Sequence, residues 1–429
     1  MEFYNVPGVS IAIINNGEIE WAKGYGTREA GTASPVDENT LFQAASISKS
    51  VSALGALHQV QRGALDLDTN INDFLVSWKV PDNEFTRIRP VTLRYLLCHG
   101  AGVNGHSLGT YSREDEIPTF LQLLEGHPPA TAGPVRVVSK PREEFGYSGG
   151  GYLIALQAMI DVTGRSFPDI MNEAVLSPLG MKRSGYFQPL EHGAMENVAA
   201  GHDEMGSVYM GYWRTIPSLA GGGLWSTPSD LCRFAIEVQR ALRGESSIIS
   251  QELAEELLTV HVGSYGLGLA LEGEGEDLAF SHGGDIEGYH NFLFAYARSG
   301  QGVAVMTNAQ NGSYLYQEIL RSVAIAYDWT HLRPSVISPV QLPMDTLNGF
   351  TGRYVFNKIL PVHVTVEDDH LKMVGDDGRI FLWYPDSDQH FIDTVTGWEL
   401  EFVFNEKRAV MGAVIDMGGA GLKGEKIDN

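Results

Sequence analysis

The sequence predicts an α+β fold followed by a small all-β domain. Three features of the 429 residues lead to this class. Strand-like apolar runs stand near residues 9–23 and again near 267–307, helical spacing dominates about 65–258, and short strand-like runs alternate with Gly and Asp turns after residue 343. Strands on both sides of a helical stretch indicate one antiparallel sheet flanked by helices, with a helical subdomain inserted between its distant segments.

A β-hairpin and a long helix are the first elements predicted. The runs Val9–Ile14 and Glu18–Lys23 flank Asn15–Gly17, and Asn and Gly adopt the positive φ angles of a tight hairpin turn. From Ser46 the apolar positions follow helical spacing, and Gly63 is a natural end for that helix.

Further helices are predicted next along the chain, and further strands after them. Within the insertion of about 65–258, helical patterns cover Leu93–Leu97, Tyr152–Val162 and Asp230–Leu242. Strand patterns then return at Leu267–Leu271, Leu278–Phe280, Asn291–Ala297 and Val303–Thr307, and a last helix is predicted over Tyr314–Tyr327.

The C-terminal part is predicted to be a separate β-domain. Residues 1–335 form the first domain, and three prolines within 333–343 indicate a linker at 336–343. Residues 344–429 then form the small β-sheet or barrel. Its predicted strands are Gly352–Phe356, Val362–Val366, Leu371–Val374, Ile380–Tyr384, Glu399–Phe404 and Ala409–Ile415.

The composition limits the kinds of partner. Lys and Arg number 30 against 53 Asp and Glu, a net charge of −23, so a general attraction to nucleic acid or anionic lipid is not expected. Small molecules are the expected partners. The sequence shows no export signal and no apolar run of about 18 residues, so we expect no membrane association and, unless a leader was removed, a cytoplasmic location.

A serine and a lysine at the start of the predicted helix form the first candidate catalytic motif. The three-residue spacing of Ser46 and Lys49 places both side chains on one helical face, about one turn apart. A serine hydroxyl needs a proton acceptor near pH 7, and a lysine whose pKa is lowered by burial provides one. The alternative is a helix-capping serine beside a solvated lysine.

Two later segments add candidate groups. Glycines flank Tyr147 in the segment 145–152, which exposes a phenol able to relay protons. In the segment His282–Asp285 a strand edge offers a backbone N–H to a developing oxyanion, and His282 lines the cleft. A Gly-rich connection and a buried structural histidine are the alternative interpretations.

Taken in order, these three motifs resemble the active-site elements of the penicillin-binding protein and class C β-lactamase superfamily of serine hydrolases. That superfamily includes DD-peptidases, D-aminopeptidases and esterases with a β-lactamase fold. The resemblance covers about residues 5–330 and includes the segments Val6–Val9, Gly63–Asp68, Leu96–Gly102, Pro178–Met181 and Ala220–Thr227. It implies a β-lactamase/DD-peptidase-like fold for the first domain.

The resemblance also implies a role for each motif residue. Ser46 is the nucleophile, Lys49 its general base, and Tyr147 carries the proton to the leaving group. The backbone N–H groups of Ser46 and Asp285, the latter next to Gly284, form the oxyanion hole. No metal or organic cofactor is implied, because acyl-enzyme chemistry needs only a serine, a base and oxyanion donors.

The chain departs from the β-lactamase pattern at two motif positions. Gly149 stands where β-lactamases carry an Asn that helps hold the substrate's acylamino group, and His282 replaces the Lys that favours a substrate carboxylate. Histidine is largely neutral near pH 7, and Asp285 adds negative charge beside it. We therefore expect a carboxylesterase or a D-amino-acid-specific peptidase or amidase that takes small esters, amides or short peptides.

Several alternatives remain open at the level of sequence. A class C-type β-lactamase or a penicillin-binding receptor without turnover would carry similar motifs. Ser148 lies in a G-x-S-x-G segment, the pattern of an α/β-hydrolase nucleophile, and Cys98, His99 and His106 are a weak candidate metal set. The C-terminal domain resembles the lipocalin-like extensions of some such hydrolases, on the evidence of residues 350–354. The oligomeric state is not predicted.

Overall fold

The computed structural model describes residues 1–190, 196–334, 338–357, 360–375, 380–394, 396–416 and 421–427. The chain divides into two compact units, Met1–Ile319 and Leu320–Asn429. The predicted domain boundary at 335 and the first residues of the predicted linker, 336 and 337, lie outside the described residues. The boundary at 335 therefore stays a prediction.

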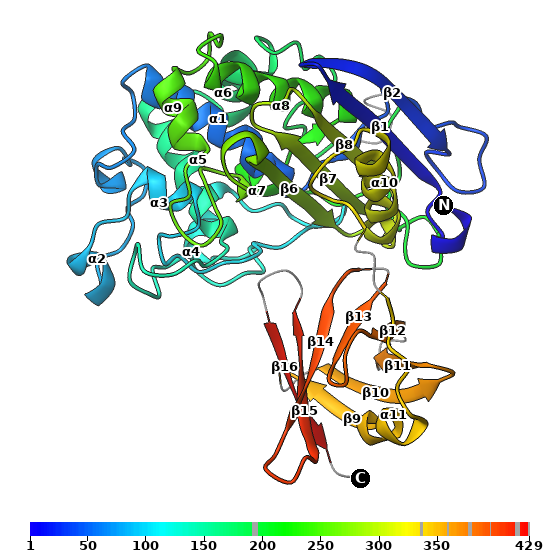
Figure 1. Cartoon of the computed structure of the whole chain (residues 1–429). Helices are drawn as coiled ribbons and strands as arrows, with labels where there is room; N and C mark the ends of the chain where they lie inside the picture. The colour runs from blue at the N-terminus through cyan, green and yellow to red at the C-terminus, as the bar shows by residue number, and fades with distance from the viewer. Residues whose placement is uncertain are drawn as a thin grey trace. The chain divides into compact units, whose positions relative to one another are not determined.

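In the described part of the first unit, six strands form one antiparallel sheet (Figure 1), in the order β2-β1-β8-β7-β6-β5. Their bounds are β1 (Gly8–Asn15), β2 (Glu18–Gly26), β5 (Ala270–Glu272), β6 (Ala279–Ile286), β7 (Tyr289–Tyr296) and β8 (Gly302–Thr307). Strand β1 pairs with β2 on one side and with β8 on the other. The sheet is thus assembled from the two ends of the unit, which confirms the predicted α+β class.

The first hairpin forms as its sequence predicts. Asn16 and Gly17 have φ angles of 53° and 74°, the left-handed conformation that a two-residue hairpin turn requires. Strand β1 is buried along nearly its whole length, whereas β2 alternates between exposed and partly buried residues. This difference is what a central strand and an edge strand should show.

Helices joined by long irregular connections occupy the region between β2 and β5. They are α1 (Ile47–Gln61), α2 (Glu84–Ile88), α3 (Leu93–Leu97), α4 (Phe120–Glu125), α5 (Gly149–Thr163), α6 (Phe167–Met171), α7 (Leu219–Gly222), α8 (Pro228–Leu242) and α9 (Gln251–Leu257). Short helical turns are η1 (Glu2–Tyr4), η2 (Ile71–Asp73), η3 (Asn172–Leu176) and η4 (Gly275–Asp277), and β3 (Phe42–Gln43) pairs with β4 (Trp225–Ser226). Helices therefore lie between the distant strands of the sheet, as the fold class predicts, and the bounds of the insertion at about 65–258 stay a prediction.

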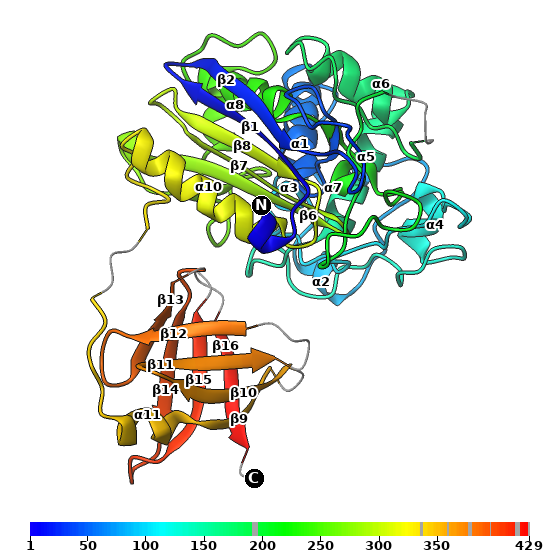
Figure 2. The same cartoon turned by 90° about the vertical axis from the view of Figure 1, so that its right-hand side faces the viewer.

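The sheet is covered on both faces. Helices α1 and α8 pack on one face, α1 against β6 and β7, and α8 against β1 and β8. Helix α10 (Gly312–Ala326) begins on the other face of the sheet (Figure 2). There Tyr316 stacks on Phe292 of β7. Since α1 lies between the sheet and the helical region, almost all of its residues are buried.

One predicted strand is shorter than expected. The prediction was Leu267–Leu271, but β5 begins only at Ala270. Gly268 has a φ of +86°, and its backbone N–H donates to the Leu97 carbonyl instead of to a strand. Its carbonyl accepts a hydrogen bond from Ser50 of α1 at 2.7 Å, so contacts with α1 and α3 bend the chain there.

The second unit contains a closed antiparallel barrel. In its described part the strand order is β10-β11-β12-β13-β14-β15-β16-β9, with β9 pairing back to β10. The strands are β9 (Gly352–Phe356), β10 (Leu360–Glu367), β11 (His370–Gly375), β12 (Ile380–Pro385), β13 (His390–Asp393), β14 (Glu399–Phe404), β15 (Val410–Asp416) and β16 (Gly421–Ile427). Closure leaves no free strand edge. The interior is filled by side chains that include Trp383, Phe391 and Phe402.

Three elements of the barrel unit were not predicted. Strand β13 is only four residues long, and β16 carries Gly and Lys where a strand pattern would need apolar residues. Helix α11 (Met344–Phe350) precedes β9 and contributes Phe350, whose ring stacks on Phe402 at 4.3 Å between centroids. No helix among the described residues has the length and apolar character needed to cross a membrane.

Candidate active site

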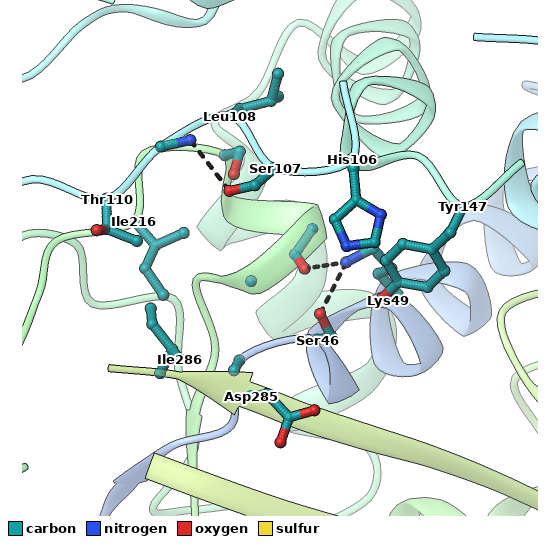
Figure 3. A pocket seen from close by; sticks show the side chains of 16 residues that line it. Ser46, Lys49, His106, Ser107, Leu108, Thr110, Tyr147, Ile216, Asp285 and Ile286 are labelled. Carbon is teal, nitrogen blue, oxygen red and sulfur yellow. Dashed lines mark hydrogen bonds between the residues drawn. The ribbon is translucent and has the colours of Figure 1, made fainter. Parts of the chain in front are cut away.

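Ser46 and Lys49 meet at the start of α1. Ser46 is the residue before the first helical turn, but its hydroxyl makes no capping hydrogen bond to the helix backbone. Instead it accepts a hydrogen bond from Lys49 Nζ at 3.1 Å (Figure 3). The hydroxyl is therefore available for chemistry, and the interpretation of Ser46 as a capping serine is wrong.

Lys49 is buried, which changes its acid–base behaviour. Lys49 is only 3% exposed. Its Nζ also donates a hydrogen bond to the Gly221 carbonyl of α7 at 2.7 Å. Burial lowers the pKa of this amine to about 7, because the low-dielectric interior disfavours the charged form. A lysine with this pKa is a competent base near neutral pH.

Tyr147 lies next to the Ser46–Lys49 pair, in the connection just before α5. Lys49 Nζ lies 4.8 Å from the centroid of the Tyr147 ring. Burial raises the pKa of the Tyr147 phenol, although its hydrogen bond with Ser46 acts in the opposite direction. The phenol is therefore protonated at neutral pH, and it is suited to give a proton to a leaving group.

His282 on β6 is buried at 4% exposure, on the same side of the sheet as α1. Its Nδ1 lies 2.6 Å from the Gly283 carbonyl, so Nδ1 carries the proton and donates it there. Burial and the nearby Lys49 lower the pKa of His282 to about 4. His282 is therefore neutral, and its buried Nε2 is an acceptor for which the described residues supply no hydrogen bond.

Gly284 allows β6 to approach the start of α1 closely. A Cβ atom at Gly284 would lie 2.2 Å from the Ala44 carbonyl oxygen. The following residue, Asp285, lines the same pocket as Ser46, and its carboxylate points away from Ser46 (Figure 3). There it lies 2.6 Å from Nδ1 of His290 on β7. Asp285 thus reaches the site through its backbone, while its charge faces the other side of the strand.

Three consecutive glycines open α5 and bring a loop against it. The backbone N–H of Gly149 donates to the His106 carbonyl at 3.3 Å, and that of Gly150 to the Gly105 carbonyl at 3.0 Å. A Cβ at Gly150 would lie 2.6 Å from the Asn104 carbonyl oxygen. Gly149 was predicted as a substrate or oxyanion residue. It lines the pocket, and its N–H is bonded to the His106 carbonyl of this loop, so a contact of Gly149 with the substrate stays a prediction.

A pocket of about 140 Å³ is lined by five of the predicted residues, Ser46, Lys49, Tyr147, Gly149 and Asp285. Its described lining includes neither His282, which was expected to line the cleft, nor Gly284. Its remaining lining includes residues that no motif indicated: His106, Ser107, Leu108, Gly109, Thr110, Ile216, Ser218 and Ile286. Residues 106–110 of this lining carry no recognisable motif in the sequence. A second groove of about 440 Å³ adjoins the pocket and shares Ser107, Gly109, Thr110, Asp285 and Ile286 with it.

The residues of the alternative sites have other roles in the structure. Ser148 is buried, accepts from the Gly151 N–H at 3.0 Å and donates to the Asn104 carbonyl at 2.6 Å, so it caps α5. Among the described residues no three His, Cys, Asp or Glu side chains gather as a metal site. Cys98 and Cys232 are buried free thiols. His99 lies beside Tyr147.

Two proteins of known name are similar to this chain in sequence. Penicillin-binding protein 4 of Amycolatopsis lactamdurans is 27% identical over 339 residues, which are 75% of this chain and 85% of that protein. Protein flp of Staphylococcus aureus (strain MRSA252) is 24% identical over 322 residues, 72% of this chain and 61% of that protein. The match to flp thus leaves more than a third of that relative uncovered.

Solved structures show the same fold. The octameric penicillin-binding protein homologue from Pyrococcus abyssi superposes with a TM-score of 0.65 at 24% identity, over 99% of this chain and 97% of that one. The D-amino acid amidase from Ochrobactrum anthropi SV3 gives 0.58 at 25% identity, over 71% and 86%. The profile of the family described as Beta-lactamase matches residues 1–326. The chain belongs to this beta-lactamase family.

Proposed function

We propose that the protein is a serine hydrolase that acts through an acyl-enzyme on Ser46. The observation that carries this proposal is the contact of 3.1 Å between Lys49 Nζ and Ser46 Oγ, made by a lysine whose pKa burial lowers to about 7. A buried lysine is costly to a fold. The position of Lys49 beside a serine hydroxyl that does not cap its helix supports a catalytic role.

The pKa of Lys49 is lowered and that of Tyr147 is raised, which assigns a different proton transfer to each residue. Lys49, neutral above about pH 7, takes the Ser46 proton as Oγ attacks the carbonyl carbon of the substrate. Tyr147, whose pKa is raised by burial, holds its proton and gives it to the leaving oxygen or nitrogen as the carbonyl–leaving-group bond breaks; the Lys49 proton then restores the phenol. Environments that push two pKa values apart in this way mark a base and an acid.

Release of the acyl group uses the same base and the same serine. Water loses a proton to the same base as it attacks the acyl carbonyl, and Ser46 recovers a proton when its ester bond breaks. In both steps the negative oxygen needs donors, and the backbone N–H groups of Ser46 and Asp285 are the proposed pair. Support for this assignment comes from the close approach of β6 to α1 that Gly284 permits.

The lining of the pocket favours an uncharged, short acyl group. Lys49 is the one Lys or Arg among the described lining residues, and it serves as the base. The neutral His282, with its pKa near 4, replaces the lysine that favours a substrate carboxylate in β-lactamases. A cavity of about 150 Å³ holds a benzene-sized group, so a pocket of about 140 Å³ suits a small side chain.

These features support a carboxylesterase or a D-amino-acid-specific peptidase or amidase. The D-amino acid amidase is among the similar structures. The leaving group would extend along the adjoining groove. Penicillin binding, with or without turnover, is the second candidate, favoured by the 27% identity to a penicillin-binding protein.

Turnover of matched chromogenic substrates tests the proposal. A short-chain p-nitrophenyl ester, a D-alanyl p-nitroanilide and nitrocefin are assayed with the wild type, Ser46→Ala and Ser148→Ala. We expect Ser46→Ala to lower kcat/KM by about 10³-fold or more. Ser148→Ala keeps most activity and loses about 1 kcal/mol of stability, because it removes the cap of α5.

The outcomes separate the candidates. Hydrolysis of the ester or anilide that exceeds that of nitrocefin supports the proposal, and the preferred substrate decides between esterase and amidase. Covalent labelling of Ser46 by a fluorescent penicillin without turnover of any substrate supports the receptor. An inactive Ser148→Ala beside an active Ser46→Ala overturns the assignment of the nucleophile.

A further inference from the structure

His99, in the connection after α3, holds the backbone on both sides of Tyr147. The N–H of Gly146 donates to the His99 carbonyl at 2.9 Å. The N–H of Ser148 donates to Nδ1 of the His99 side chain at 3.0 Å. The residues before and after Tyr147 are thus both held by one residue, 48 positions away from Tyr147 in the chain.

The His99 ring also packs against the phenol itself. The centroids of the His99 and Tyr147 rings are 4.3 Å apart, and the ring planes are tilted by 32°. His99 is only 2% exposed, and its φ of +62° lies in the left-handed region. Such a backbone is uncommon for a residue other than glycine, and histidine is among the types that tolerate it. The surrounding structure therefore keeps an unfavourable backbone to place this ring.

The hydrogen bonds of His99 determine its tautomer. A backbone N–H only donates, so Nδ1 of His99 is the acceptor and the proton of the neutral ring is on Nε2. Burial keeps the pKa of His99 well below its ordinary value, and the nearby Lys49, His282 and His106 act in the same direction. A protonated His99 would lose the bond to Ser148, because both of its nitrogens would then be donors.

We propose that His99 is a positioning residue for the proton transfer to the leaving group: it fixes Tyr147 through Ser148 and through its own ring. The proposal rests on the proposed function, since Tyr147 is the proton donor only in that mechanism. His99 does not line the pocket among its described residues, so it acts through Tyr147 and not on the substrate.

The leaving group of the substrate provides the test. A p-nitrophenolate leaves without needing a proton, whereas an amine must be protonated as it leaves. Two substrates with the same acyl group, a p-nitrophenyl ester and an alkyl amide, are therefore compared with the wild type, His99→Gly and His99→Asn. Both substituting residues tolerate a positive φ, but only Asn offers an oxygen to the Ser148 N–H.

We expect His99→Gly to lower kcat for the amide about 10- to 100-fold more than kcat for the ester, with KM nearly unchanged. His99→Asn should recover most of the amide activity. Tyr147→Phe is the reference for the full loss of the proton donor. Equal losses on both substrates, or no recovery by Asn, would overturn the inference.

Two further results remain distinguishable. If the wild type hydrolyses neither substrate, the proposed function fails before His99 is tested. If His99→Gly does not fold, His99→Phe replaces it, since Phe keeps a ring and removes the acceptor. The amide-to-ester ratio of His99→Asn should then stay closer to the wild-type ratio than that of His99→Phe, and the opposite order contradicts the proposal.

Discussion

The two walls of the pocket differ in how they are built. The catalytic wall consists of Ser46, Lys49 and Tyr147, and Lys49 is only 3% exposed. The loop wall consists of residues 106–110 with Ile216 and Ser218, and His106 and Ser107 are exposed. Ser46 and Lys49 of the catalytic wall are fixed by the geometry of α1, and Tyr147 immediately precedes α5, while the loop wall is held mainly by contacts between connections. Changes in the first should alter rate, and changes in the second should alter substrate preference.

Removing the base should have the largest effect. Lys49→Met keeps an unbranched side chain of similar length but no proton acceptor, and we expect kcat/KM to fall about 10³-fold. Thermal unfolding, measured beside activity, separates this loss from misfolding. A folded Lys49→Met variant with activity within about tenfold of the wild type would mean that the catalytic wall does not use this base.

The pH profile tests the same wall without mutation. The pKa of Lys49 is about 7. If its neutral amine is the base, as proposed, kcat/KM should rise with pH and level off above about 7. Below that value it should fall about tenfold for each pH unit. The profile is measured with a p-nitrophenyl ester between about pH 4.5 and about pH 9, so that it extends about two pH units to each side of the Lys49 pKa. A kcat/KM that stays level down to the lowest pH of this range would contradict Lys49 as the base and would point to His282, whose pKa is about 4.

A single methyl group should separate β6 from α1. Gly284→Ala places Cβ against the Ala44 carbonyl, 2.2 Å away in the present geometry, so the strand must move away from Ser46. We expect a loss of about 10- to 100-fold in kcat, typical of a displacement near 1 Å. Gly283→Ala is the matched control, because its Cβ has no neighbour closer than 3.8 Å. Equal effects of the two substitutions would contradict the proposed contact.

A substitution in the loop wall should have the smallest effect, and it should change the preference between substrates and not the overall rate. Ile216→Ala enlarges the pocket, and the ratio of kcat/KM for a hexanoyl ester to that for an acetyl ester should rise about tenfold. Leu121→Ala, an exposed residue outside the pocket lining, is the control. An unchanged ratio in a folded Ile216→Ala variant would show that Ile216 does not limit the acyl group.

Sequence patterns predicted the elements whose signals are local. The hairpin turn at Asn16, the helix after Ser46 and the strand Gly352–Phe356 all carry their own turn, spacing or apolar pattern. Strand β16 was missed, because its strand state comes from pairing with β15 and β9 and not from its own residues. Strand β5 was misplaced because α1 and α3 hold Gly268.

The same distinction applies to the site. Ser46 and Lys49 are three residues apart, and Tyr147 stands in a glycine-flanked segment, so their chemistry is visible in short stretches of sequence. The position of His106 depends on a close contact between its loop and the glycines that open α5. The role of His99 depends on a hydrogen bond to a residue 49 positions away. Spacing along the chain contains no signal for either contact.

The pairing of β1 with β8 has a consequence for how the protein reaches its active form. Residues 9–14 pair with residues 302–307, and β6, next to β7 in the same sheet, closes the pocket beside Ser46. Loop closure over about 290 residues is slow compared with local helix formation. During synthesis, a nascent chain that already contains Ser46, Lys49 and Tyr147 therefore remains inactive until the strands near residue 300 have emerged and joined the sheet.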